Sequence, residues 1–281
     1  MTGGTLKSPP YEQGRAVILR RKITAKKRYT IGLISCGLLA MAWLLATEVL
    51  GVNPMILPGP GALAASAKKL HYENYLIANA LTSLLRITLG FIAAAVVAIP
   101  VGIAMGAFSS VRAALNPILS PLRYLPIAAI IPVFIFWFEL GETMKISLLF
   151  LGTFVYLLPL VVETVDQVDD VYLKIAQTLG AGPVKQITTI LLPACLPAIF
   201  DALRVMFGIG WTYVMLAEFM QTTDQDGLGY PGVGYLMNQL RRFGTLSDVL
   251  VAVALILFIG VLVDMLMRWL GATLFPWYDR S

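Results

Sequence analysis

Ionisable residues interrupt several long apolar stretches of this 281-residue chain, and Arg86, Arg204 and Glu218 are the most informative of them. A charged side chain at the centre of a bilayer costs roughly 2.5–3.5 kcal/mol on insertion scales, so such residues usually pair or line a route for polar solutes. An arginine beside such a route attracts an anion, and a glutamate can orient a neighbouring polar group. We therefore take Arg86, Arg204 and Glu218 as candidate residues of a translocation pathway.

Each of these residues also has a structural interpretation. Asp201 precedes Arg204 by three residues on the same helical face, so the two can form a local ion pair. Arg86 is expected near the outer end of its apolar stretch, where a long side chain can extend to the interface. For Glu218, and for Asp264 in the last apolar stretch, helix packing is the alternative to a role in a pathway.

Residues that could catalyse a reaction or bind a metal are scarce. Two cysteines, Cys36 and Cys195, and one histidine, His71, cannot supply a four-ligand protein zinc site. Glycines cluster late in the chain, at Gly227, Gly229, Gly232 and Gly234. No Gly-Lys-Ser/Thr follows these glycines, so we expect an outer-surface turn against a partner rather than a nucleotide loop. We predict no catalytic residues, no metal site and no cofactor bound by this chain.

The elements that position these residues must be membrane helices. Hydrophobic residues make up 58% of the chain and charged residues only 13%, and the mean hydropathy is +0.79. Soluble domains carry roughly 25% charged residues. Because hydrocarbon offers no partner for free backbone groups, membrane-spanning segments of this kind are helical. We therefore predict an all-α, polytopic membrane protein that does not bind nucleic acid.

Six apolar stretches approach the ~20 residues that a membrane helix requires. They cover residues 30–51, 84–108, 119–140, 145–165, 195–220 and 248–272. Basic residues concentrate before the first stretch, which places both termini in the cytoplasm by the positive-inside rule. The first stretch is long enough to be an uncleaved anchor rather than a signal peptide. We divide the chain into a basic cytoplasmic elbow segment, residues 1–29, and a transmembrane domain, residues 30–281.

A stripe of small residues follows one face of the second predicted span. Gly90, Ala94, Ala98, Gly102 and Gly106 recur every four residues. Such a stripe lets another helix approach closely. The neighbouring helix can belong to the same chain or to a second subunit, and the sequence leaves both open.

The longest polar stretch between apolar segments, residues 166–194, is predicted to lie in the cytoplasm. Asp169 or Asp170 can cap a helix that ends at Gly180. Pro183 suits the first turn of the next helix, where no backbone donor is needed. The sequence therefore predicts a short, rigid and partly apolar helix–turn–helix that requires a covering partner.

This loop carries a spaced motif. Residues 174–180 read Lys-Ile-Ala-Gln-Thr-Leu-Gly, and Ile-Leu-Leu-Pro follows at 190–193. The spacing resembles the coupling loop of bacterial ABC importer permeases, where Glu-Ala-Ala and Gly precede Ile-x-Leu-Pro. Lys174 stands where the family has glutamate, and Ile175 where it has its first alanine. Because exposed ion pairs contribute about 0–1 kcal/mol, the reversed charge at Lys174 is compatible with docking of an ATPase.

Further stretches extend the resemblance over residues 57–277. They include Leu-Pro-Gly-Pro at 57–60, Ser-Leu-Leu-Arg at 83–86, Leu-Gly-Ala at 179–181, Leu-Pro-Ala-Cys-Leu-Pro-Ala-Ile at 192–199 and Pro-Trp at 276–277. On these residues the chain is similar to the nitrate/sulfonate/taurine/bicarbonate group of type I ABC importer permeases. The resemblance implies that the ATPase-coupling residues are Lys174, Ile175, Ala176, Leu179, Gly180, Ala181, Ile190, Leu192 and Pro193.

The resemblance also implies a fold and a set of partners. The fold is the MetI-like permease fold with six transmembrane helices, in a bacterial inner membrane. The partners are a second copy of the chain, two ATPase subunits that use ATP and Mg²⁺, a soluble binding protein outside the cell, and membrane lipid. The expected function is uptake of a small anionic solute by alternating access. An ATP-independent carrier or channel, and a membrane scaffold that transports nothing, remain as alternatives.

Overall fold

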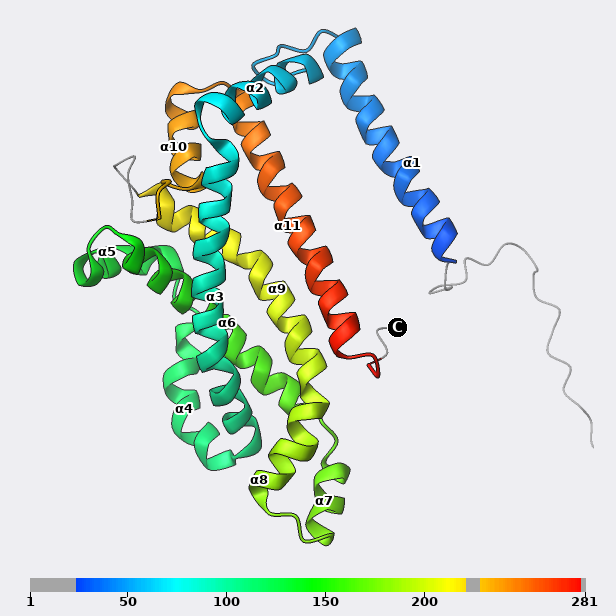
Figure 1. Cartoon of the computed structure of the whole chain (residues 1–281), viewed down its shortest axis with the longest axis vertical. Coiled ribbons are helices and arrows are strands. Elements are labelled where there is room, and N and C mark those ends of the chain that lie inside the picture. The colour runs from blue at the N-terminus through cyan, green and yellow to red at the C-terminus, as the bar shows by residue number, and fades with distance from the viewer. Residues whose placement is uncertain (1–23, 221–227, 279–281) are drawn as a thin grey trace, which may run out of the picture. The chain divides into compact units, whose positions relative to one another are not determined.

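The computed structural model describes residues 24–220 and 228–278, and all regular secondary structure in these two ranges is helical (Figure 1). The chain divides into two units, residues 1–59 and residues 60–281. The helices of the first unit are α1 (Ala25–Leu44) and the π-helical η1 (Leu45–Val49). Those of the second are α2 (Pro60–Glu73), α3 (Leu76–Ala107), α4 (Ser109–Leu122), α5 (Ile127–Phe138), α6 (Glu142–Asp166), α7 (Asp170–Thr178), α8 (Pro183–Gln186), the π-helical η2 (Ile187–Leu191), α9 (Leu192–Phe219), α10 (Val233–Phe243) and α11 (Leu246–Leu274).

Five helical runs in the described residues are long and apolar enough to cross a membrane. They are Lys26–Val49, Leu76–Ala107, Glu142–Asp166, Pro183–Phe219 and Leu246–Leu274. These runs correspond to the first, second, fourth, fifth and sixth predicted spans. Two runs begin earlier than predicted: α3 begins at Leu76 rather than at residue 84, and the fifth run begins at Pro183 rather than at residue 195. The all-α prediction is confirmed for the described part of the chain.

The prediction of one helix over residues 119–140 is wrong. α4 ends at Leu122, α5 begins at Ile127, and the two helices are bent by 98° relative to each other. Pro126 directly precedes α5, and a proline pushes the residue before it, here Leu125, away from helical geometry. With this bent pair taken as one broken span, the described residues contain up to six candidate spans.

The first unit ends in a segment that folds back on its own helix. The Trp43 indole N–H donates to the carbonyl oxygen of Pro58 at 3.3 Å, and the Thr47 hydroxyl donates to the Trp43 carbonyl at 3.1 Å. The proline-rich stretch after η1 is thereby fixed to the end of the helical run. Of the predicted elbow segment, residues 1–23 lie outside the described residues.

The core of the second unit is formed mainly by α3, α6 and α9. Close packing of α3 on α6 depends on the small-residue stripe. A Cβ on Gly90 would lie 2.5 Å from the Cβ of Leu149, and one on Gly102 would lie 2.7 Å from Val161. The stripe is therefore occupied by α6 of the same chain, which decides in favour of packing within the chain.

A smaller cluster joins α2, α10 and α11 at the other end of the second unit. Its buried members include Leu70 of α2, Leu240 of α10 and Ala252 of α11. The Lys69 Nζ also lies 3.4 Å from the Asp248 Oδ2, which links α2 to α11. The segment before the second predicted span contains α2 and the first turns of α3.

Candidate functional site

The predicted helix–turn–helix is present as α7 and α8. Asp169 caps α7, because its Oδ1 accepts a hydrogen bond from the Val171 backbone N–H at 2.9 Å. Pro183 is the first residue of α8, where its missing N–H leaves no helical bond unmade. The start of each helix is therefore set by a residue at or directly before it in the sequence.

The turn between these helices is a Schellman motif centred on Gly180. The Ala181 N–H donates to the Ala176 carbonyl at 2.9 Å, and the Gly180 N–H donates to the Gln177 carbonyl at 3.0 Å. Gly180 adopts a φ of +78°, which side-chain-bearing residues rarely tolerate. The glycine is thus required by the backbone, since a Cβ there would meet no other atom within 4 Å.

The surface of this hairpin is apolar and open to solvent in the isolated chain. Its large exposed residues are Val171, Tyr172, Ile175, Leu179 and Val184. Leu179 is 81% exposed and Val184 is 74% exposed. A face of this kind beneath a membrane protein is typical of a surface that a partner covers.

The structure separates the nine predicted coupling residues by their burial. The exposed ones are Lys174, Ile175, Leu179, Gly180 and Pro193. Ala176 is buried, Ala181 is half-buried in the turn, and Ile190 and Leu192 are half-buried where the hairpin joins α9. The first group can contact a partner, whereas the second holds the hairpin in place. Val171, Tyr172 and Val184 belong to the exposed apolar face but are missing from the predicted set, although their helical spacing is visible in the sequence.

The hairpin is continuous with a long membrane helix. α8, η2 and α9 form one helical run from Pro183 to Phe219. Within this run the Leu192 N–H donates to the Ile187 carbonyl five residues earlier, just before Pro193, which has no N–H to donate. The wider π-helical turn thus accommodates the proline without ending the helix.

Arg86 and Glu218 lie in a buried ionic cluster that joins α3, α6 and α9. The Arg86 Nη1 lies 2.7 Å from the Glu218 Oε1, and the Arg86 Nε donates to the Glu142 Oε2 at 2.8 Å. Arg86 has no exposed side-chain surface. The expectation that it extends to the interface is therefore wrong, because two carboxylates pair with it inside the protein. Lys145, whose Nζ lies 3.5 Å from the Glu142 Oε1, balances the second carboxylate.

The same cluster holds the turn that leads into α10. The Gly234 N–H donates to the Glu218 Oε2 at 2.8 Å, and the Arg86 Nη1 donates to the Pro231 carbonyl at 2.8 Å. Gly232 adopts a φ of +101°, and a Cβ on it would overlap the Glu218 carboxylate. Gly232 and Gly234 of the predicted glycine turn thus pack against α9 of their own chain, Gly229 faces open space, and Gly227 lies outside the described residues.

Arg204 pairs with a residue on another helix. Its Nε donates to the Asp264 Oδ1 of α11 at 2.5 Å, whereas the Asp201 Oδ1 lies 3.9 Å from its Nη1. Asp264 also accepts a hydrogen bond from the Arg268 Nε at 2.8 Å. Arg204 lines a cavity of about 530 Å³ between α9 and α11, and its role in a translocation pathway stays a prediction.

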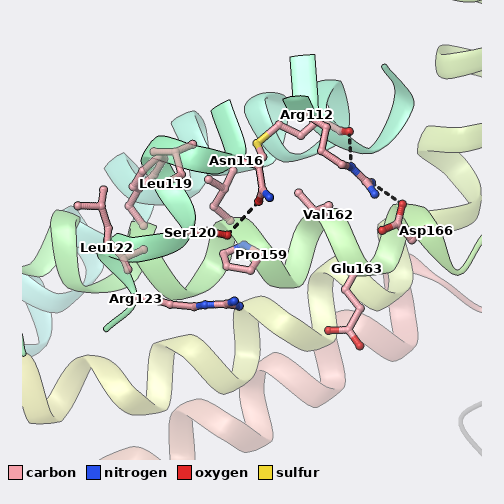
Figure 2. Close-up of a pocket in the computed structure, with 14 residues that line it drawn as sticks. Arg112, Asn116, Leu119, Ser120, Leu122, Arg123, Pro159, Val162, Glu163 and Asp166 are labelled. Atoms are coloured by element: carbon pink, nitrogen blue, oxygen red, sulfur yellow. Dashed lines mark hydrogen bonds and ion pairs between the residues drawn. The ribbon is translucent and has the colours of Figure 1, made fainter. Parts of the chain in front are cut away.

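A polar cavity of about 410 Å³ lies between α4 and α6 (Figure 2). Figure 2 shows Arg112, Asn116 and Ser120 following one another along α4, and Arg123, the residue after α4, beneath Pro159 of α6. Their spacing of four, four and three residues is that of a single helical face. None of these residues was among the predicted pathway residues. Their spacing is visible in the sequence, but Arg112 and Asn116 fall between two predicted spans, and Ser120 and Arg123 fall inside the third.

Comparisons with known proteins agree with this architecture. Residues 87–275 match the family described as "Binding-protein-dependent transport system inner membrane component". The chain is 33% identical over 248 residues to the "Taurine transport system permease protein TauC" of Escherichia coli strain K12, covering 86% of this chain and 87% of that protein. It is 30% identical over 190 residues to the "Bicarbonate transport system permease protein CmpB" of Synechococcus elongatus, covering 68% of this chain and 66% of that protein.

The fold itself matches a solved structure. A chain of the inward-facing MetNI methionine ABC transporter superposes with a TM-score of 0.61 at 15% identity, covering 71% of this chain and 96% of that chain. The predicted MetI-like permease fold is thereby confirmed. At this identity the match concerns the fold alone.

Proposed function

Because this chain belongs to the family of inner membrane components of binding-protein-dependent transport systems, we propose that it forms the pathway of an ATP-driven importer of a small anionic solute. A member of this family is a transport subunit rather than an enzyme, and its system includes a binding protein and an ATPase. ATP and Mg²⁺ belong to the ATPase in this proposal. Two copies of the chain would enclose the pathway between them, with two ATPase subunits below.

The single observation that carries the coupling role is the exposed apolar face of the α7–α8 hairpin. Ile175 is 53% exposed and Leu179 81% exposed, on a turn whose backbone is held by the Schellman motif. Burying an aliphatic side chain of this size contributes roughly 1.5–3 kcal/mol. The hairpin is also continuous with α9, so a displacement at the ATPase would reach the membrane along one helix.

The orientation of the chain in the membrane follows from the proposed docking of an ATPase on the α7–α8 hairpin. An ATPase that docks on the hairpin requires α7 and α8 to face the cytoplasm. An even number of spans then places both termini on the cytoplasmic side and the turn before α10 on the outer side, where the binding protein delivers solute.

The solute class that we propose is based on the solutes for which two relatives are named. One relative is named for taurine, an aminosulfonate, and another for bicarbonate, so a small oxyanion or sulfonate is the class that we propose. Arg86 and Glu218 would support the pathway by holding α3, α6 and α9 together, since their charges are already paired in the protein interior. Arg204 would lie beside the cavity between α9 and α11 with its charge shared with Asp264.

Ile175→Asp tests the coupling role, with Gln177→Asp as its matched control on the same helix. Both side chains are exposed, but only Ile175 belongs to the apolar face. We expect Ile175→Asp to insert in the membrane, to lose co-purification with the ATPase, and to reduce ATP-dependent uptake by tenfold or more. Gln177→Asp should retain both properties. Normal uptake by Ile175→Asp combined with Leu179→Asp would refute coupling through this hairpin.

The two alternative functions, an ATP-independent carrier or channel and a scaffold, predict different results in a transport assay. An ATP-independent carrier or channel would transport solute in proteoliposomes without the ATPase and would be insensitive to vanadate. A scaffold would give no flux under any condition. Vanadate-sensitive flux that requires the ATPase and the binding protein would exclude both.

A further inference from the structure

The cavity between α9 and α11 is an apolar groove with charged residues at one end. Both helices are long and apolar enough to cross a bilayer, and they lie side by side in the second unit (Figure 1). Phe207 and Trp211 are buried in the lining of this cavity of about 530 Å³, whereas Val205, Leu257 and Val261 are exposed along it. An apolar groove between two membrane helices suits hydrocarbon rather than water.

Two glycines widen the groove from both walls. Gly208 of α9 and Gly260 of α11 line the cavity, and a Cβ on either residue would meet no atom within 4 Å. α11, which the structure describes in full, also has no buried residue between Ala252 and Gly271. The described parts of the chain therefore leave the middle of α11 only partly covered. In a bilayer, such a face is covered either by lipid or by another helix.

One carboxylate brings two guanidinium groups together at the charged end of the groove. The Asp264 Oδ1 accepts a hydrogen bond from the Arg204 Nε at 2.5 Å, and the Asp264 Oδ2 accepts one from the Arg268 Nε at 2.8 Å. Asp201 contributes less, since its Oδ1 lies 3.9 Å from the Arg204 Nη1. The Arg268 side chain is 61% exposed, and within residues 24–220 and 228–278 its Nη1 has no partner. This end of the groove can therefore donate hydrogen bonds to an anion.

The charged cluster lies in the half of the membrane nearer the α7–α8 hairpin. The Phe275 ring, directly after α11, packs against the Phe200 ring of α9 with their centroids 5.8 Å apart. This contact places the end of α11 beside the hairpin half of α9. Arg204 lies one helical turn beyond Phe200, and Arg268 lies six residues before the end of α11. The arginines are thus near the membrane surface, and the apolar walls extend from them towards the interior.

We propose that this groove binds one anionic phospholipid of the bilayer. Its phosphate accepts hydrogen bonds from Arg268 and Arg204, and one acyl chain lies along Gly208 and Gly260. Basic pockets between membrane helices on the cytoplasmic side bind anionic headgroups in this way. Charge favours a lipid over a second protein helix, because an apolar helix such as α1 of another copy would bring no acceptor for the free Arg268 donor. The site is separate from the coupling hairpin and does not depend on which solute the importer carries.

Native mass spectrometry of the permease–ATPase complex in detergent tests the lipid site without depending on transport. The complex is titrated with phosphatidylglycerol or with phosphatidylcholine that carries the same acyl chains. We expect the first phosphatidylglycerol to bind about tenfold more tightly than phosphatidylcholine, because its net charge complements the two arginines. Arg268→Gln should abolish this preference, and Arg268→Lys should retain part of it. Gly260→Leu should weaken binding of both lipids, because the added side chain fills the groove.

The matched controls are Arg28→Gln and Gly37→Leu in α1. Arg28 is exposed, a Cβ on Gly37 would meet no atom within 4 Å, and neither residue lines the cavity. Both variants should bind the two lipids as the original protein does. Thermal unfolding without added lipid should be the same for Arg268→Gln and the original protein, which separates lipid binding from folding.

Two results would overturn the lipid site. One is equal binding of both lipids by the original protein, and the other is an unchanged preference in Arg268→Gln. The same spectra count the permease copies in the complex. Loss of one copy in Gly260→Leu, with both lipid affinities unchanged, would identify a helix of a second copy as the occupant and would also overturn the proposal.

Discussion

Arg86 and Glu218 form an ion pair of 2.7 Å in which neither side chain has any exposed surface. A buried ion pair stabilises a protein only when further hydrogen bonds complete it. Here the Ser83 hydroxyl and the Gly234 N–H both donate to the Glu218 carboxylate at 2.8 Å. Glu218 also lies near the end of the helical run that begins at Pro183. One helix therefore connects the turn before α10 with the hairpin proposed to receive the ATPase.

Removing one partner of this ion pair should be strongly destabilising. We expect Glu218→Ala to lower the free energy of unfolding by about 3–5 kcal/mol, because Arg86 would keep a buried charge with one carboxylate fewer. Thermal unfolding in detergent measures the effect. The double variant Arg86→Met with Glu218→Met should recover part of the loss. Equal stability of Glu218→Ala and the original protein would show that the pair does not hold these helices.

Gly232 and Gly229 offer a matched pair of substitutions in the turn before α10. Both have positive φ, +101° and +94°, so alanine strains the backbone at each position. Only at Gly232 would the added Cβ also overlap the Glu218 carboxylate, since Gly229 faces open space. We expect Gly232→Ala to lower the unfolding temperature clearly more than Gly229→Ala. Indistinguishable effects would mean that the turn does not press on Glu218.

The close approach of α3 and α6 predicts a second matched pair. Gly102→Ala would place a methyl group 2.7 Å from Val161, whereas Gly260→Ala in α11 meets no atom within 4 Å. Overpacking typically costs about 1–3 kcal/mol, while glycine to alanine in an uncrowded helix is neutral or stabilising. Thermal unfolding should therefore separate the two variants. Adding Val161→Ala to Gly102→Ala should restore part of the stability, and no restoration would contradict the contact.

The hairpin turn predicts a local rather than a global effect. Gly180→Ala forces alanine into a φ of +78°, at a cost of about 1–2 kcal/mol, whereas Gly182 has an ordinary φ of −69°. We expect amide hydrogen exchange in α7 to accelerate in Gly180→Ala and to stay unchanged in Gly182→Ala. Asparagine at Gly180 should be better tolerated than alanine, because it adopts left-handed geometry more readily. Unchanged exchange in Gly180→Ala would show that the turn does not order α7.

The prolines of the broken span show where sequence reasoning reached its limit. Pro121, Pro126 and Pro132 fall in the apolar stretch 119–140, Pro117 lies just before it, and each is compatible with a kinked membrane helix. Only one of these prolines directly precedes a new helix, and the bend of 98° depends on how α4 and α5 pack against α6. The cavity beside α4 was not predicted either, because only the packing of α4 against α6 brings its lining residues together.

The sequence by itself determined the properties that depend on neighbouring residues. Apolar length set the helical membrane class and most of the spans, and Asp169, Gly180 and Pro183 set the ends of the hairpin helices through local hydrogen bonds and backbone geometry. Only the tertiary structure decided which charges meet. Arg86 contacts carboxylates 56 and 132 residues away, and Arg204 pairs with a residue 60 positions away. Such pairs arise from the packing of separate helices, and helical periodicity carries no information about which helices become neighbours.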